Sequence, residues 1–246
     1  MSSLTIAFDA DDTLWHNETL FAVTSEQIGA LLAPYADPVN LHRRLVDTER
    51  RNLRLFGYGV KGFTLSMIES AIEVSEGRVS AREIQTILEA GKKLLAHPIE
   101  LLPQVRESLE VLARKHNLMM ITKGDLFHQE SRIAMSGLGD LFTAVEIVSE
   151  KNPSTYQKIL RRYHLDVENF VMVGNSVKSD ILPVLEVGGR AIHIPYEITW
   201  ELEVAELGNP DPARCRRCHS IAQVESTLAD FFAPSSRPPT EVRPQG

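Results

Sequence analysis

Cysteine is scarce in this chain. Its 246 residues include two, Cys215 and Cys218, in the run Cys-Arg-Arg-Cys. Two thiols cannot complete a tetrahedral zinc site, and His219 would add only a third ligand. No strand–helix–strand context around the pair favours a redox function. We therefore expect two reduced thiols in a C-terminal loop, with an opportunistic disulfide as the alternative.

Basic charge and long apolar runs are also lacking. The chain carries 26 Lys and Arg against 33 Asp and Glu, a formal net charge of −7 at pH 7, which argues against a general binder of nucleic acid or of a membrane surface. No apolar run approaches the ~18–20 residues of a membrane span. No basic segment leads into an apolar one near the N-terminus, as a secretory signal requires. We expect a cytoplasmic protein with neither nucleic acid nor membrane as a partner.

What remains is the composition of an ordinary globular protein. Hydrophobic residues make up 43% and charged residues 24%, and the length suits one large domain or two small ones. Residues 234–246 are rich in Pro, with Ser, Arg and Gln, so we expect a disordered tail there.

Short apolar runs predict the strands of a buried parallel sheet. They are Leu4–Phe8, Leu118–Ile121, Ala144–Val148, Phe170–Val173 and Ala191–Ile194. Helical spacing separates the later runs, with Pro103 opening one helix, and with Asn152 as N-cap and Pro153 as first residue of another. Gly188 and Gly189 would stop a third helix. This alternation predicts an α/β fold, a Rossmann-like parallel sheet with helices on both faces.

The first connection is too long for an ordinary crossover. Roughly 100 residues follow the first strand before the second begins, where about a dozen suffice. Residues 16–97 carry helical patterns, including a capping box at Ser80 and Glu83. We therefore expect an inserted all-helical domain over 16–97 and an α/β core of residues 1–15 and 98–233. The hinges of the insert lie near the end of the first strand, so it is placed to act as a lid.

Three acids stand directly beyond the first strand, in the run Asp9-Ala10-Asp11-Asp12-Thr13. Open α/β sheets bind ligands beyond the carboxyl ends of their strands. Three carboxylates in four positions repel one another unless a cation neutralises them. The run therefore predicts a divalent metal ion and, with it, phosphate chemistry.

The same run resembles the first motif of the haloacid dehalogenase (HAD) superfamily, Asp-x-Asp-x-Thr. Three further motifs follow in the expected order: Thr122 at the end of the second strand, Lys151 opening Lys-Asn-Pro-Ser, and a glycine-plus-acid motif from Gly174 to Asp180. The resemblance covers about residues 4 to 200, and the helical insert stands where this superfamily places a C1-type cap. It implies a Mg²⁺-dependent phosphatase acting on a small phosphorylated metabolite.

The chemistry of these residues fits the resemblance. Asp9 would be the nucleophile that forms an aspartyl-phosphate, and Asp11 the general acid and base. Lys151 would place an ammonium group beside the phosphoryl oxygens. The hydroxyl group of Thr122 and the N–H groups of Lys123 and Gly124 would bind the phosphate. The expected ligands of the metal are Asp9, the main-chain carbonyl of Asp11, Asn175 and Asp180.

Asn175 departs from the pattern, because the superfamily usually has an Asp after this glycine. An amide oxygen can bind Mg²⁺ or a metal-bound water, but it brings no charge. Two other interpretations stay open. A metal-free 2-haloacid dehalogenase uses the same nucleophile on carbon, although Asp11 and Asp180 together favour phosphoryl transfer. The other is a non-catalytic protein that kept the fold and binds a phosphorylated ligand.

Two features of the insert bear on its substrate. Residues 43–61 carry six basic side chains against two acidic ones. These form either a solvated helix face with ion pairs such as Arg43–Asp47 or a basic lip that steers an anionic substrate. The glycine-rich stretch 57–63 is a candidate specificity loop, in which Lys61 is either a surface lysine or a substrate contact. We expect a monomer or a homodimer.

Overall fold

The computed structural model describes residues 4–232, and the tail predicted for 234–246 lies outside them. In the described part of the chain, six parallel strands form one sheet in the order β3-β2-β1-β4-β5-β6. The strands are β1 (Thr5–Phe8), β2 (Asn117–Lys123), β3 (Ala144–Val148), β4 (Phe170–Gly174), β5 (Arg190–His193) and β6 (Cys215–Arg217). The five predicted strands are confirmed, and β6 is an addition.

Strand β1 lies at the point where the strand order reverses. Its last residue, Phe8, is in register with Met120 of β2 and with Val173 of β4. The next residue, Asp9, donates its N–H to the carbonyl of Val173 at 2.9 Å. The carboxyl ends of three neighbouring strands therefore meet around Asp9, at the kind of switch point where α/β sheets bind ligands.

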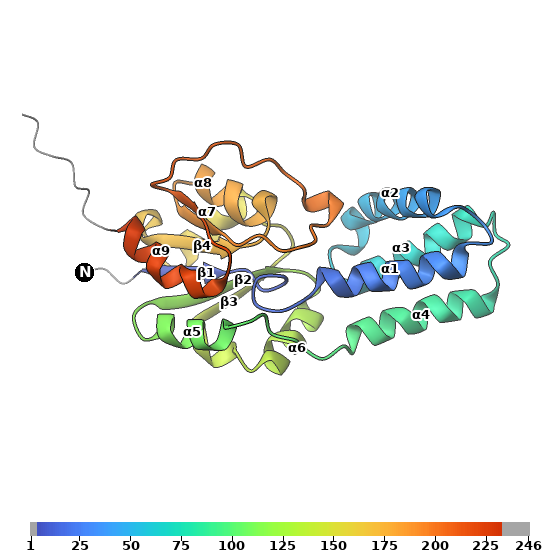
Figure 1. Ribbon diagram of the computed structural model, residues 1–246, viewed down its shortest axis with the longest axis horizontal. Helices are drawn as coiled ribbons and strands as arrows, with labels where there is room; N and C mark the ends of the chain where they lie inside the picture. Colours follow the sequence, from blue (N-terminus) through green and yellow to red (C-terminus); the bar gives the residue numbers. More distant parts are fainter. Residues whose placement is uncertain (1–3, 233–246) are drawn as a thin grey trace, which may run out of the picture.

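Helices cover both faces of the sheet, as predicted (Figure 1). One face packs against α5 (Val105–Ala113), α6 (Leu126–Ser136) and α9 (Val224–Phe231). The other packs against α7 (Pro153–Arg162) and α8 (Leu182–Glu186). Burial on both faces explains why the central strands are continuous apolar runs in the sequence.

Two local predictions for these helices differ in outcome. Helix α7 begins at Pro153, and the side chain of Asn152 accepts from the N–H of Thr155, as expected of an N-cap. Pro103 does not open α5, however, since that helix begins at Val105. The reason is Gln104, whose φ of 64° places it in the left-handed region and separates the proline from the helix.

The cysteines are free thiols, but the predicted loop is wrong for one of them. Cys215 begins the edge strand β6, which pairs with β5. Both thiols are buried, and burial raises their pKa. They therefore behave as small apolar core residues.

Five helices lie between β1 and β2, and the last of them, α5, packs on the sheet. The other four are α1 (Glu18–Leu32), α2 (Pro38–Phe56), α3 (Val60–Val74) and α4 (Ala81–Leu95). They form a helical unit at one end of the molecule (Figure 1) and share an apolar cluster of their own. The capping box of Ser80 and Glu83 is present at the start of α4. Among residues 4–232, no helix combines the length and apolarity needed to cross a bilayer.

Candidate active site

A cavity of about 920 Å³ lies between the carboxyl ends of the strands and helices α1, α2 and α3. Every residue that the sequence predicts for the site lines it: Asp9, Asp11, Thr122, Lys123, Gly124, Lys151, Asn175 and Asp180. The motifs are far apart in the chain, and the parallel sheet brings them together because each lies at or just beyond the carboxyl end of a strand.

Lys151 bridges the two carboxylates at the floor of the cavity. Its Nζ lies 2.5 Å from Oδ1 of Asp9 and 2.7 Å from Oδ1 of Asp180. Burial raises the pKa of Asp9 to about 7, because it outweighs the opposing effect of the Lys151 ammonium. Burial lowers the pKa of Lys151, but the carboxylates of Asp180 and Asp9 raise it above its usual value. Two buried carboxylates thus share one ammonium group, which leaves excess negative charge.

The local backbone explains how Asp180 reaches this position. It lies in a π-helical turn, Val177–Ile181, and its Oδ2 accepts the N–H of Ser176 at 3.0 Å. The carboxylate packs against Gly174, where an added Cβ would lie 2.3 Å from Oδ2. Gly174 is therefore required by the close approach of the carboxylate rather than by an unusual φ.

Oxygen donors for a metal ion surround the same point. The Thr13 hydroxyl lies 3.2 Å from Oδ2 of Asp9 and 3.2 Å from Oδ1 of Asn175. Within residues 4–232, no group of three or more His, Cys, Asp or Glu could hold a metal. Two carboxylates and an amide oxygen nevertheless suit Mg²⁺, which keeps several waters and needs few protein ligands. The excess negative charge shared by Asp9 and Asp180 fits a cation as well.

Asp11 is turned toward α6 and held by three donors. Its Oδ1 lies 2.7 Å from Nε1 of Trp15 and 2.8 Å from Nη1 of Arg132. Its Oδ2 accepts from Nε2 of Gln129 at 3.0 Å. These three contacts fix the position of the Asp11 carboxyl group.

Gln129 and Arg132 are site residues that the sequence analysis missed. Nε2 of Gln129 also donates to the hydroxyl of Thr122 at 2.7 Å. Gly124 has a φ of 145°, and an added Cβ there would lie 3.0 Å from Cγ of Gln129. The sequence offered one signal for Gln129 and Arg132. They are three residues apart on the helix that follows the Thr122 motif, and this spacing places both on one face of the helix.

The third acid of the cluster, Asp12, has a structural role. Its carboxylate accepts the N–H groups of Asn17 at 2.8 Å and of Glu18 at 3.0 Å, where α1 begins. Burial raises its pKa to about 7, against the lowering effect of the Glu18 N–H. We expected a metal to relieve the repulsion among the three acids. Groups of the protein relieve part of it, because Lys151 pairs with Asp9 and Arg132 pairs with Asp11.

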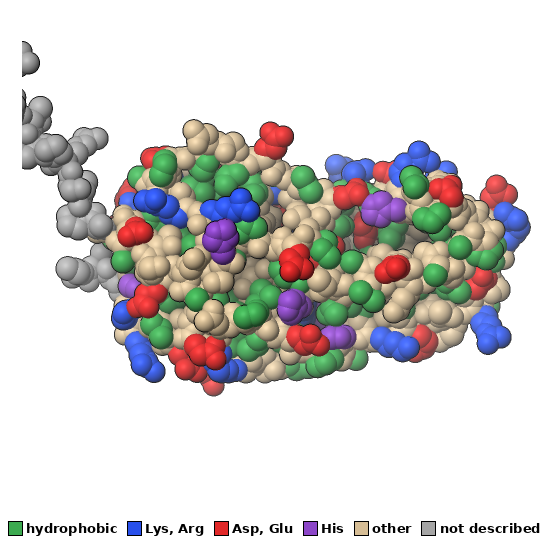
Figure 2. All heavy atoms as spheres, in the orientation of Figure 1, with side chains coloured by type: hydrophobic (Ala, Val, Ile, Leu, Met, Phe, Trp, Pro, Cys, Tyr) green, Lys and Arg blue, Asp and Glu red, His purple; other side chains and the backbone are tan. Residues whose placement is uncertain are grey.

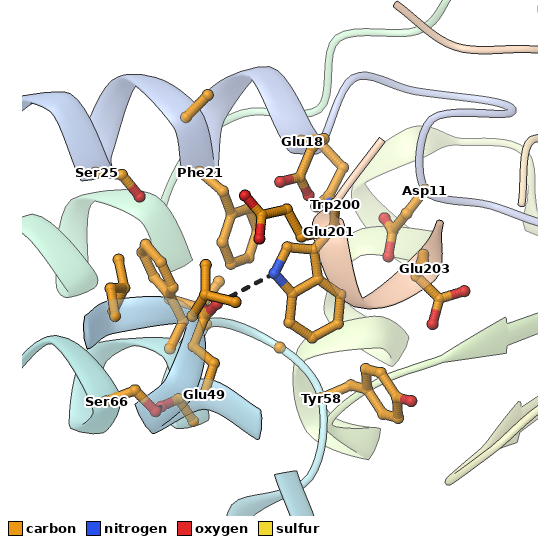
Figure 3. A pocket seen from close by; sticks show the side chains of 18 of the residues that line it. Asp11, Glu18, Phe21, Ser25, Glu49, Tyr58, Ser66, Trp200, Glu201 and Glu203 are labelled. Atoms are coloured by element: carbon orange, nitrogen blue, oxygen red, sulfur yellow. Dashed lines mark hydrogen bonds between the residues drawn. The ribbon is translucent and has the colours of Figure 1, made fainter. Parts of the chain in front are cut away.

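The ammonium group of Lys123 lies in a cage of side chains. It is 2.7 Å from Oε1 of Glu203 and 2.8 Å from Oγ of Ser179. It also lies 4.1 Å from the centre of the Tyr58 ring. Tyr58 comes from the predicted specificity loop and donates its hydroxyl to Oε2 of Glu150 at 2.7 Å. Tyr58 and Glu203 both line the cavity (Figure 3), and the sequence analysis gave no signal for Glu203.

The arginines of α2 do not reach the cavity, although His42 of the same helix lines it. Lys and Arg side chains gather over α2 at the outer surface of the molecule (Figure 2). Arg51 pairs with Glu73 of α3 at 2.8 Å, and Arg50 rather than Arg43 pairs with Asp47. None of these arginines lines the cavity, and neither does Lys61, which pairs with Asp125. The interpretation as a solvated helix face is confirmed, and the basic lip is wrong.

Comparison with known proteins identifies the family. Residues 4–188 match the profile of the haloacid dehalogenase-like hydrolases. A haloacid dehalogenase-like family hydrolase from Xanthomonas campestris is 42% identical, with 94% of this chain and 92% of that chain covered and a TM-score of 0.83. No curated protein matches the chain.

More distant structures share the fold. A 2-haloacid dehalogenase from Pseudomonas syringae pv. tomato DC3000 is 22% identical over 93% of this chain and 99% of that one, with a TM-score of 0.61. A predicted phosphoglycolate phosphatase from Haemophilus somnus 129PT is 19% identical over 93% and 99%, with a TM-score of 0.62. The profile match and the relative at 42% identity show that this chain belongs to the haloacid dehalogenase-like hydrolase family and is a hydrolase.

Proposed function

We propose that the protein is a Mg²⁺-dependent phosphatase that hydrolyses a small phosphorylated metabolite through an aspartyl-phosphate on Asp9. The observation that carries the proposal is the cluster of Asp9, Lys151 and Asp180, with Asp11 on the same cavity wall. A dehalogenase needs the nucleophile, but it has no evident use for two further carboxylates around it. The helical unit, close to the predicted insert 16–97, would serve as a C1-type cap over the cavity.

The residues present fit the metal that hydrolases of this family generally use. Asp9, Asp180 and Asn175 would hold Mg²⁺, together with the main-chain carbonyl of Asp11. When bound, the cation would offset the negative charge of the carboxylates and of the phosphoryl group.

The side chains of the site would divide the work between two steps. A carboxylate oxygen of Asp9 attacks phosphorus, and the bond from phosphorus to the leaving oxygen breaks. A water molecule then attacks the aspartyl-phosphate and releases inorganic phosphate and the Asp9 carboxylate. Lys151 and the Thr122 hydroxyl lie on the wall where phosphoryl oxygens would be bound, so they would stabilise the charge that develops there.

Asp11 would carry the proton. It would protonate the leaving oxygen in the first step and take a proton from the attacking water in the second. The contacts with Trp15, Arg132 and Gln129 fix the position of its carboxyl group at the cavity wall.

The proposal is tested by hydrolysis of an aryl phosphate with Mg²⁺ and with EDTA. Activity should require both Mg²⁺ and Asp9, and Asp9→Asn should abolish it. The matched control is Asp140→Asn, at an exposed position outside the cavity. Substantial activity in Asp9→Asn would remove the covalent mechanism. Chloride release from a 2-haloacid in EDTA would favour the dehalogenase, and ligand binding without any turnover would favour the binding protein.

A further inference from the structure

The wall that the helical unit gives to the cavity carries several acidic groups, and its one basic side chain among the described residues, His42, pairs with Glu201 at 2.7 Å. Residues 17–70 are all described, and those among them that line the cavity include Glu18, Glu26 and Glu49 but no Lys or Arg. The cations that line it from the sheet side are paired with carboxylates of their own: Lys123 with Glu203, Arg132 with Asp11, and Lys151 with Asp9 and Asp180.

Glu18 and Glu49 pair with no Lys or Arg among the described residues, although His42 lowers the pKa of Glu49. Glu49 is 9% exposed and accepts from Nε1 of Trp200 at 3.1 Å. Burial, together with the nearby carboxylates of Asp12 and Glu49, raises the pKa of Glu18 to about 8. Burial likewise raises the pKa of Glu49 to about 7, against the lowering effect of the Trp200 bond. Glu18, Glu49 and Trp200 converge on one space (Figure 3).

A second polar group in this region also lacks a partner. The side chain of Ser70 lines the cavity, and the residue is 4% exposed. Within the described residues, its Oγ makes no hydrogen bond. A buried hydroxyl without a partner costs about 1–3 kcal/mol, so a ligand that supplies one would gain affinity.

The rest of this wall is apolar. Phe21, Ile28, Val46, Phe63 and Met67 line it. A cavity of about 920 Å³ is at the upper end of the ~300–1,000 Å³ that ligand sites enclose, more than a phosphate group alone needs. Apolar walls with a few polar groups favour an extended organic group at this end.

We propose that the substrate is a phosphate monoester whose alcohol part is an apolar chain bearing a protonated amine, with Glu18 and Glu49 as receptors for the ammonium group. This rests on the proposed phosphatase function for the phosphate end. An ammonium group shared by the two carboxylates would offset part of their negative charge, while a carboxylate or second phosphate on the same chain would add to it.

The test compares three phosphate monoesters that differ at one end: 6-aminohexyl phosphate, hexyl phosphate and the phosphate of 6-hydroxyhexanoate. At about pH 8.5 the amine is protonated and both glutamates are largely ionised. We expect kcat/KM for hexyl phosphate to be ~10-fold lower than for 6-aminohexyl phosphate. For the phosphate of 6-hydroxyhexanoate, we expect kcat/KM to be lower by a further ~10-fold. In the double variant Glu18→Gln/Glu49→Gln, the ratio of kcat/KM for 6-aminohexyl phosphate to kcat/KM for hexyl phosphate should fall by ~10-fold. Glu89→Gln, exposed on α4 and outside the cavity, should keep the ratio.

A binding measurement separates this proposal from the phosphatase. Hexylamine should raise the melting temperature of the wild type more than hexanoate does, and the double variant should lose that difference. If the protein hydrolyses no phosphate monoester, aryl phosphate included, the phosphatase function is rejected. The comparison of melting temperatures with hexylamine and hexanoate then still tests the amine site, because it does not depend on turnover. The amine site is overturned if hexanoate stabilises as well as hexylamine, if the carboxylate ester is the best substrate, or if the folded double variant keeps the preference for amine.

Discussion

The guanidinium group of Arg132 pairs with the carboxylate of Asp11, with Nη1 2.8 Å from Oδ1. The same guanidinium contacts the hinge that leads into α1, where it lies 2.5 Å from Oδ1 of Asn17 and 3.2 Å from the carbonyl of His16. One side chain thus connects the proposed general acid and base with the segment on which the helical unit would move. We expect Arg132 to act as a positioning residue for Asp11.

Replacing Arg132 by Met should lower kcat far more than it changes KM. The reason is that a misplaced general acid and base can cost about 10²-fold in rate while substrate binding is retained. Arg132→Lys keeps a cation and should recover part of the loss. Arg106→Met is the control, because Arg106 contacts main-chain carbonyls away from the cavity. Steady-state kinetics with an aryl phosphate would show the split, and an equal loss in both parameters would contradict the assignment.

Lys151→Met should destabilise the fold strongly at pH 8 without Mg²⁺. Removing one partner of a buried ion pair costs about 3–5 kcal/mol, and here Asp9 and Asp180 would both lose their cation. Because the pKa of Asp9 is about 7, its protonation at pH 5 should relieve part of the loss, as should added Mg²⁺ at pH 8. Urea unfolding in the three conditions measures this, with Lys158→Met, exposed on α7, as the control.

Asn175→Asp should tighten Mg²⁺ binding and lower stability without Mg²⁺. Both effects follow from a third carboxylate beside Asp9 and Asp180. A titration of the melting temperature with Mg²⁺ would show both. Asn169→Asp, at the opposite end of β4, is the control for a general charge effect. An unchanged Mg²⁺ titration would place Asn175 outside the metal site.

Stability in EDTA should fall as the pH rises from about 5 to about 8. Burial raises the pKa of Glu18 to about 8 and that of Glu49 to about 7. Between its unfolded and folded pKa values, such a group binds more protons in the folded protein. Its stabilisation is therefore complete below the unfolded value and lost as the pH passes the folded one.

Glu18→Gln should remove part of this pH dependence. The variant should melt higher than the wild type at pH 8, by about 2–4 °C for each kcal/mol recovered, and the gain should shrink toward pH 5. Thermal unfolding in EDTA across this range would test it. Parallel pH profiles for the two proteins would show that Glu18 is not the group responsible.

Gly174→Ala should displace Asp180. An added Cβ would lie 2.3 Å from Oδ2 of Asp180, and overpacking of this kind typically costs about 1–3 kcal/mol. We expect lower stability together with weaker Mg²⁺ binding, measured in the same thermal titration. Gly139→Ala is the control, since the nearest atom to its added Cβ is 3.7 Å away. A stable variant with unchanged Mg²⁺ affinity would mean that Asp180 can move without consequence.

Local pattern predicted the fold, and the resemblance to the superfamily's motifs named residues that line one cavity. The apolar runs of the strands, the cap at Asn152 and the capping box at Ser80 all depend on neighbours within a few residues. The four motifs could be placed together because residues at the carboxyl ends of parallel strands share one edge. Strand β6 was not predicted from the sequence, because its three residues, Cys215–Arg217, include two exposed arginines and make no apolar run.

The partners of those residues were decided by tertiary structure. Gln129 reaches Asp11 across 118 positions of sequence, and Trp200 reaches Glu49 across 151. No periodicity encodes such pairs, because they form only where two separately folded elements dock. The sequence therefore determined that Asp9, Asp11 and Lys151 meet at one edge of the sheet. Docking decided that Asp11 faces Arg132 and that the helical unit gives the cavity acids in place of its arginines, since a helix buries one face and leaves the other to solvent.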